Sequence, residues 1–312
     1  MAQFHCLTFL TDYGLEDAFV AVCHGVAFRI APDIRIIDIT HLIPPGDIKR
    51  GAVVLAQAVP YLPPSVHVAV VDPGVGTARR AIAVKAGGSI FVGPDNGLLA
   101  AASASAASAA SAASASAASA SAASASAALA EAAAGAGGAT RAVALTNRAL
   151  WRGSPGLDET VAATFHGRDI FMPVAAWLAS GVPLAEAGDP IDPATLVTLP
   201  RPECLVTSGA AKVEVVTVDR FGNAQLSLTG AAAAEAGFVP GTTVTLSWNE
   251  LRITAPFATT FGDVDPGELV CYRDSSGLIA VAVAGGDAAR RLGLRAGTTM
   301  TLTVSPPASA NG

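Results

Sequence analysis

The order of apolar segments in the first hundred residues most constrains the fold. Short apolar runs, which predict strands, alternate with stretches whose apolar residues recur at helical spacing. The expected strands are 4–10, 34–39, 66–71, 81–84 and 89–92, and the expected helices are 17–30 and 48–58. This alternation is typical of an α/β layer with a mainly parallel sheet, in which ligands bind beyond the carboxyl ends of the strands.

Polar residues follow several of these strands at the point where each ends. Asp12 follows the first, Asp72 follows the third in VVDPGVGTARR, and Asn96 follows the fifth in GPDNG. Arg79 carries a guanidinium seven residues after Asp72. The pair is either a salt bridge that stabilises a turn or part of a binding site for a small polar ligand. Its position at the end of a strand favours the ligand-binding role.

The pattern of predicted helices and strands changes beyond Pro200. A further strand at 141–145 and a loop entering a helix at 163–181 precede this point, whereas short strands dominate after it, at 213–218, 224–228, 242–247, 269–272 and 299–304. Their spacing predicts a small antiparallel barrel or sandwich. The proline-rich LPRPECL, 199–205, marks the boundary. We therefore expect an N-terminal α/β domain over 1–199 and a C-terminal domain over 205–305.

Residues 100–128 contain only alanine and serine. The serine spacing fits neither a helical stripe nor strand alternation. Alanine favours helix, so one expectation is a protruding helix roughly 40 Å long. Because the run lacks an apolar face, a partly disordered insertion over about 100–138 is the alternative. We assign it no chemistry.

Composition excludes several classes of function. The formal net charge is −6 without a basic run, which argues against nucleic acid as a partner. We expect no signal peptide and no membrane span, and therefore a cytoplasmic protein. The sequence lacks a G-x-S-x-G elbow and an H-E-x-x-H motif. We predict no metal site, and we expect reduced, buried thiols at the four scattered cysteines: Cys6, Cys23, Cys204 and Cys271.

Seven motifs occur in a familiar order: TDYGLEDAF, ITHLIPPGDI, VVDPGVGTARR, FVGPDNGLL, TFHGRDIF, VDRFGN and YRDSSG. In this order they strongly resemble the S-adenosylmethionine (SAM) hydroxide adenosyltransferases, relatives of the fluorinases and chlorinases. The resemblance covers nearly the whole chain except the Ala/Ser run and the last few residues. It implies an N-terminal α/β domain, a C-terminal β-barrel, and a homotrimer that binds SAM between the N-terminal domain of one subunit and the C-terminal domain of the next.

The resemblance also implies the reaction, which is in-line attack of water on ribose C5′ to give adenosine and methionine. It assigns Asp72, Arg79 and His166 to the attacking water. A carboxylate holds or accepts the water's proton, and a guanidinium favours the ionised carboxylate. Arg80 remains an alternative to Arg79 at this stage. The sulfonium is already a good leaving group, so we expect no cofactor and no loss of activity with chelators.

For the nucleoside, the resemblance assigns Asp12 to the ribose hydroxyls and Asn223 to the adenine edge. These types suit the roles, since a carboxylate accepts from two hydroxyls and an amide both donates and accepts. Phe165 and Phe261 are candidates for apolar contact with the nucleoside.

For the methionine, the resemblance places Asp17 and Asp219 near the ammonium group and Ser275 near the carboxylate. The next position, Ser276, is arginine in fluorinase, so the carboxylate contact differs here. Two further residues of the motifs complete the predicted substrate site: Asn96 and Phe221.

Two other functions remain open. A chlorinase-like halogenase would bind halide beside the Asp72 carboxylate, where two anions repel in a dry site. Fluorinase has tyrosine at the position of Asp72, tyrosine and serine at His166 and Gly167, and a long loop where 85–88 is short. A non-catalytic SAM or adenosine sensor would not need Asp72, Arg79 and His166 together. The Ala/Ser run could also serve as a partner-binding surface with either function.

Overall fold

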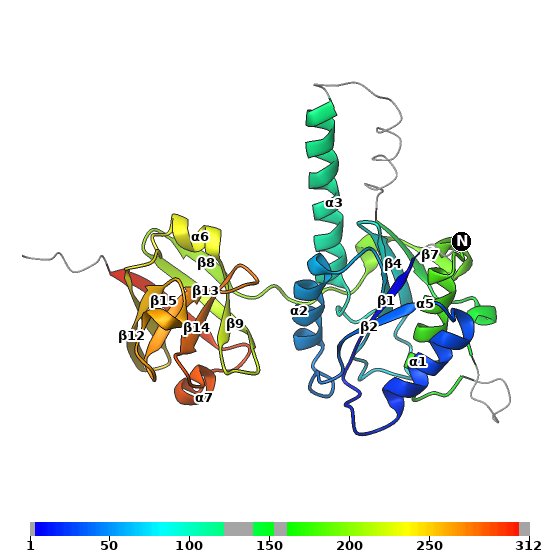
Figure 1. Cartoon of the computed structure of the whole chain (residues 1–312), viewed down its shortest axis with the longest axis horizontal. Helices are drawn as coiled ribbons and strands as arrows, with labels where there is room; N and C mark the ends of the chain where they lie inside the picture. The colour runs from blue at the N-terminus through cyan, green and yellow to red at the C-terminus, as the bar shows by residue number, and fades with distance from the viewer. Residues whose placement is uncertain (1–3, 122–139, 153–160, 306–312) are drawn as a thin grey trace, which may run out of the picture. The chain divides into compact units, whose positions relative to one another are not determined.

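The computed structural model describes residues 4–121, 140–152 and 161–305, and side chains within α3 only as far as residue 112. The chain divides into two compact units, Met1–Leu199 and Pro200–Gly312 (Figure 1). Among the described residues, no helix is long and apolar enough to cross a membrane.

The N-terminal unit is built on a seven-stranded sheet in the order β2-β1-β3-β5-β4-β6-β7. The pairs β1–β2, β1–β3 and β3–β5 are parallel, and β4, β6 and β7 add antiparallel pairs at the other side. The prediction of a mostly parallel sheet is confirmed. The strands are β1 (Cys6–Thr11), β2 (Arg35–Thr40), β3 (Val66–Val70), β4 (Ala81–Ala86), β5 (Ser89–Pro94), β6 (Arg141–Ala144) and β7 (Asp189–Ile191).

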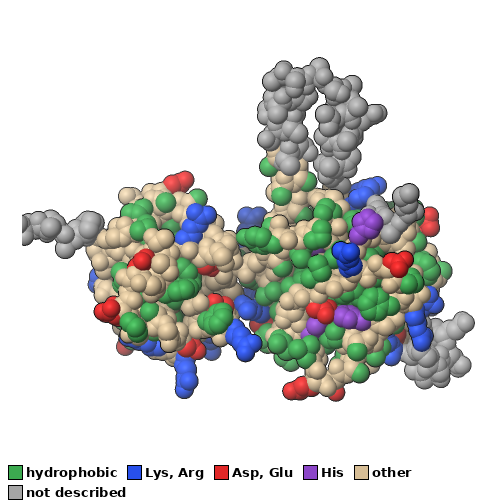
Figure 2. All heavy atoms as spheres, in the orientation of Figure 1, with side chains coloured by type: hydrophobic (Ala, Val, Ile, Leu, Met, Phe, Trp, Pro, Cys, Tyr) green, Lys and Arg blue, Asp and Glu red, His purple; other side chains and the backbone are tan. Residues whose placement is uncertain are grey.

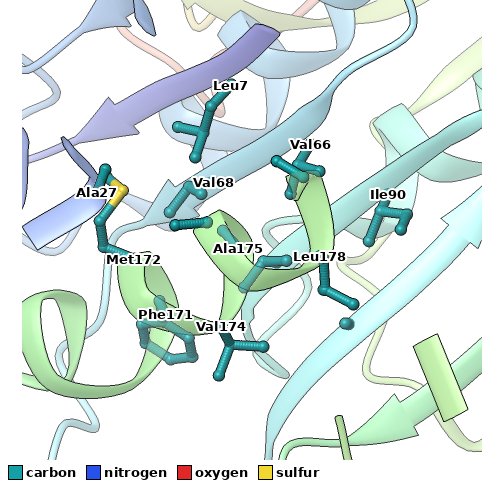
Figure 3. Packing of buried hydrophobic residues seen from close by; sticks show 14 of the residues in the cluster. Leu7, Ala27, Val66, Val68, Ile90, Phe171, Met172, Val174, Ala175 and Leu178 are labelled. Atoms are coloured by element: carbon teal, nitrogen blue, oxygen red, sulfur yellow. The ribbon is translucent and has the colours of Figure 1, made fainter. Parts of the chain in front are cut away.

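Helices pack on the sheet in two hydrophobic clusters. α1 (Phe19–Ile30) and α5 (Met172–Ala179) contribute to one cluster, and α2 (Ile48–Ala58) and α3 (Ala100–Ser121) to the other. In the first, Phe171 and Met172 lie with side chains of β1 and β3 such as Leu7 and Val68 (Figure 3). The strands are buried along their lengths here because helices cover them, as parallel sheets require.

The start of the Ala/Ser run is helical, in line with the expectation of a helix. α3 occupies 100–121, and residues 122–139 lie outside the described part. Its first turns are anchored, since Ala102 is fully buried and Ala106 packs on the same cluster. These turns are therefore buried although the run lacks an apolar face, because alanine is small enough to approach the sheet closely.

The C-terminal unit is a closed barrel. Its strands follow the order β10-β14-β13-β12-β11-β15-β9-β8, and an additional β10–β9 pairing closes seven of them on one another. The predicted barrel is confirmed; one pair within it, β12–β13, is parallel. The elements are β8 (Cys204–Thr207), β9 (Ala210–Val218), β10 (Ala224–Thr229), α6 (Gly230–Glu235), β11 (Thr243–Trp248), β12 (Leu251–Ala258), β13 (Leu269–Arg273), β14 (Leu278–Val283), α7 (Ala288–Leu292) and β15 (Thr299–Ser305).

Candidate active site

Three neighbouring parallel strands, β1, β3 and β5, end at the same edge of the N-terminal sheet. The loops that follow them carry Asp12, Asp72 and Asn96 respectively. Side chains from three distant parts of the sequence therefore gather at one edge, which is where ligands bind in sheets of this kind.

Asp72 and Arg79 form a nearly buried ion pair. Their side chains are 5% and 11% exposed, so solvent screens the pair weakly. Arg79 Nε donates to Asp72 Oδ1 at 3.0 Å and Oδ2 at 3.1 Å, and Nη2 donates to Oδ2. Phe171 lies beneath the guanidinium, with its ring centroid 5.0 Å from Arg79 Cζ. This planar grip fixes the orientation of the carboxylate.

Arg80 is bound elsewhere. Its Nε donates to Asp95 Oδ2 at 2.8 Å, and its Nη2 donates to the carbonyl of Thr195 at 2.6 Å. The two neighbouring arginines thus point to different partners, and Arg79 is the one that pairs with Asp72.

His166 joins the pair through Arg79. Arg79 Nη2 lies 2.8 Å from His166 Nδ1. A guanidinium can only donate, so Nδ1 accepts and the neutral ring carries its proton on Nε2. Burial lowers the pKa of His166, and the charge of Arg79 lowers it further. The geometry therefore favours a neutral imidazole whose Nε2–H is a donor.

Glycines allow the segments VVDPGVGTARR and TFHGRDIF to pack closely, the first against Ala163 and the second against Tyr13. Gly76 has φ +77°, and a Cβ on it would lie 2.6 Å from the carbonyl oxygen of Ala163. A Cβ on Gly167 would lie 2.0 Å from Tyr13 Oη. Immediately after His166, Gly167–Phe171 forms a π-helical turn that leads into α5. Such turns are frequent at functional sites.

Tyr13 belongs to this cluster, although sequence reasoning did not single it out. Burial raises its pKa well above the usual value of 10.0, and nearby Cys23, Asp12 and Asp72 add to the effect. Its ring packs edge-on against Phe165 at 5.7 Å between centroids. The only signal for it in the sequence is its place after Asp12 in TDYG.

The other predicted residues of this unit are placed differently. Asp12 Oδ2 accepts from Gly46 N at 2.8 Å, which orients its carboxylate. Asn96 donates to the carbonyl of Val71 at 2.9 Å and accepts from Leu98 N at 3.2 Å, so its amide links the ends of β3 and β5. Asp17 is exposed in the loop before α1.

In the C-terminal unit, Asp219 and Asn223 organise the loop between β9 and β10. Asp219 Oδ1 accepts from the backbone N–H of Phe221 at 2.8 Å and of Asn223 at 2.9 Å. Asp219 Oδ2 accepts from Asn223 Nδ2 at 2.8 Å, which orients the amide. Phe221 is 77% exposed at the tip of this loop, a large apolar surface for a short turn.

Further predicted residues of this unit lie at neighbouring loops. Phe261 packs edge-on against Tyr272 with 5.1 Å between ring centroids. Burial raises the pKa of Tyr272 to about 12, and the negative charges of Asp219 and Asp274 add to this. Phe261, Asp219 of the 219–223 loop and Asp274, next to Ser275, therefore all lie near Tyr272.

A strand-end carboxylate held by a guanidinium, with a neutral imidazole beside it, defines a site that can orient a small polar molecule and a water. Comparison with known families identifies the family of the chain. Residues 7–134 and 125–188 match the SAM hydroxide adenosyltransferase N-terminal domain, and residues 213–301 match the C-terminal domain of the same family. The chain belongs to the SAM hydroxide adenosyltransferase family.

Individual relatives are similar over nearly the whole chain. An (R)-S-adenosyl-L-methionine hydrolase from Salinispora tropica is 49% identical, covering 97% of this chain and 99% of its own. A fluorinase from Actinoplanes sp. is 27% identical, covering 95% and 97%. Among solved structures, an uncharacterized conserved protein from Thermotoga maritima has a TM-score of 0.77 at 33% identity, covering 95% and 99%.

Proposed function

We propose that the protein hydrolyses SAM to adenosine and L-methionine by in-line attack of water on ribose C5′. The observation that carries this is the arrangement of Asp72, Arg79 and His166, in which one guanidinium holds both a carboxylate and an imidazole. The (R)-S-adenosyl-L-methionine hydrolase relative at 49% identity supports the same substrate.

The attacking water needs an acceptor for its proton and a donor that orients its oxygen. A carboxylate offers about four acceptor positions. Arg79 makes three contacts with Asp72, which leaves room for the water's O–H. His166 Nε2–H is suited to donate to the water oxygen, whose remaining lone pair then faces C5′. Asp72 is the proton acceptor in this scheme, because the imidazole already carries its proton on the nitrogen that faces away from Arg79.

The substrate itself supplies the leaving group. A sulfonium departs as neutral methionine thioether, so no acid is needed at sulfur and no cofactor enters the scheme. The enzyme contributes position and desolvation. Asp12 holds the ribose hydroxyls, Phe165 and Tyr13 form an apolar wall, and Asn223 reads the adenine edge. We expect turnover to persist in the presence of chelators.

Water is favoured over halide by charge. Asp72 is nearly buried, and a halide beside it would place two anions in a poorly solvated site. Gly167 adds a second reason, because the fluorinase-type serine at this position would place its Cβ against Tyr13.

The oligomer is part of the proposal. The candidate residues for one substrate are divided between two units of the chain. A homotrimer in which the N-terminal unit of one subunit meets the C-terminal unit of the next would complete each site. The four cysteines are free thiols, which supports a reducing compartment such as the cytoplasm. The expectation of burial is wrong for Cys204, which is exposed on the edge strand β8.

The test is incubation of SAM with purified protein in water enriched in heavy oxygen, with and without chloride, followed by chromatography and mass spectrometry. We expect methionine and adenosine with the heavy oxygen at its 5′ position, and little product from Asp72→Asn. Chlorinated nucleoside would instead show a halogenase. Unchanged SAM with measurable binding would show a sensor.

A further inference from the structure

A second cluster of polar side chains lies on the N-terminal unit, between α1 and the edge strand β2. It comprises His24 on α1, Asp38 on β2 and His41 just after β2, and we call it the His–Asp–His cluster. Figure 2 shows histidine side chains next to a carboxylate over this part of the unit. The proposed reaction uses none of these three side chains.

The three side chains present their ligand atoms to one another. Asp38 Oδ1 lies 2.9 Å from His24 Nε2 and 3.1 Å from His41 Nε2. All three ligand atoms lie within 4.8 Å of one another. His24 is half-buried and Asp38 is exposed, whereas the His41 side chain is 3% exposed. An ion could therefore reach the cluster from solvent and find a fixed ligand at its base.

His41 directs a buried ring nitrogen toward Asp38. Its Nε2 is buried, lies 3.1 Å from Asp38 Oδ1, and makes no hydrogen bond of good geometry among the described residues. Buried polar nitrogens are rarely left without a partner, and each exception calls for an explanation such as an ion. This nitrogen faces the Asp38 carboxylate oxygen, and both atoms could coordinate one cation.

The other nitrogen of His41 is held by the protein. His41 Nδ1 lies 2.9 Å from Thr11 Oγ1, which also accepts from Tyr13 N at 3.1 Å. Metal-binding histidines commonly use their second nitrogen in this way, because the hydrogen bond fixes the ring and its tautomer. Phe9 packs against the same ring with 4.9 Å between centroids and limits its rotation further.

We propose that the His–Asp–His cluster binds a divalent transition-metal ion, with Zn²⁺ the best match. Two imidazoles and one carboxylate favour zinc over calcium or magnesium, which prefer oxygen ligands. Tetrahedral zinc separates its nitrogen and oxygen ligands by about 3.3 Å, given bonds of about 2.0–2.2 Å. The two distances to Asp38 Oδ1 are within a few tenths of an ångström of this. Water would complete the coordination.

Binding would clamp α1 to an edge strand. Among the described strands, β2 has a neighbour on only one side, and all of its residues are partly or fully exposed. The metal would add a cross-link between the two elements. Through Thr11 the clamp also reaches the backbone of Tyr13, so it would steady the loop that carries Asp12 without entering the chemistry.

Metal-stripped protein without an affinity tag provides the test. Co²⁺ is added while visible absorption is recorded, and Zn²⁺ is then titrated in competition. We expect one equivalent to bind, with d–d bands of a nitrogen- and oxygen-ligated site. Zn²⁺ should also raise the thermal midpoint, because an ion that binds only the folded state stabilises it.

Matched variants locate the site. His24→Ala and Asp38→Asn change partly exposed side chains, and each should weaken binding at least about tenfold. His5→Ala removes an exposed histidine outside the cluster and should bind as wild type does. Circular dichroism checks that each variant is folded. The proposal is overturned if folded wild type binds no equivalent of Co²⁺ or Zn²⁺, or if His24→Ala binds as tightly as wild type.

Discussion

Arg79 determines how the candidate active site is organised, because it binds Asp72 with its Nε and one Nη and reaches His166 with the same Nη. A lysine has a single ammonium and cannot reproduce a planar fork. Arg79→Lys should therefore lower kcat for SAM hydrolysis about a hundredfold, the scale of a misplaced acid–base group.

Arg80→Lys is the matched control, since Arg80 binds Asp95 and Thr195. It should keep kcat near the wild-type value while lowering the thermal midpoint. Equal losses of kcat in both variants, measured by adenosine release, would contradict the assignment.

His166 should stay neutral through the physiological range. Burial and Arg79 lower its pKa from 6.5, so the ring is unprotonated above that value and protonates only at more acidic pH. Protonation would set imidazolium against guanidinium and break the Nδ1 contact. We expect kcat/KM to hold as pH falls through 6.5 and then to drop.

Proton NMR of the imidazole ring gives a direct measurement. The resonance is assigned by its absence in His166→Gln. A titration midpoint above 6.5 would show that the ring is not in the environment described.

At the scale of helices and strands, sequence patterns predicted the elements whose boundaries depend on neighbouring residues. The helix predicted at 48–58 matches α2, which Asp47 caps by accepting from Arg50 N at 2.9 Å. β12 was missed because Pro256 and two charged or polar positions interrupt its apolar pattern. The π-helical turn at Gly167–Phe171 has no local signature, and residues distant in sequence pack against it: Tyr13 against Gly167 and Arg79 over Phe171.

His67, on β3, makes the free energy of unfolding depend on pH. It is 1% exposed at the centre of the sheet, beside Thr8 Oγ1 at 2.9 Å, and burial lowers its pKa to about 4. The unfolded chain, with a pKa near 6.5, binds this proton more readily. Stability is therefore full above pH 6.5 and falls as pH drops toward 4, by about 3 kcal/mol from this group.

Urea unfolding at several pH values measures this effect. His67→Asn keeps a polar atom near Thr8 without the titrating ring. The free energy of unfolding of the variant should fall less between pH 6.5 and 4 than that of wild type. Parallel curves for the two proteins would contradict the assignment to His67.

At the scale of the whole molecule, the chain separates after Leu199 into two compact units, and the residues predicted for the substrate site lie in both. The strand-end positions of Asp12 and Asp72 follow from α/β logic alone. The pairing of Arg79 rather than Arg80 does not, because two adjacent arginines have the same local signal. The His–Asp–His cluster was equally hidden, since its members come from a helix and an edge strand whose approach is tertiary.

Subunit complementation tests the proposed trimer. Asp72→Ala disables the N-terminal part of a site and Asn223→Ala the C-terminal part, so each homotrimer should be inactive. If each site combines the N-terminal unit of one subunit with the C-terminal unit of the next, co-expression in equal amounts leaves about a quarter of the sites intact. The mixed protein should then recover about a quarter of wild-type turnover, and light scattering should give about three times the chain mass of 31.0 kDa. No recovery from a trimer of the two chains would place the whole site within one subunit.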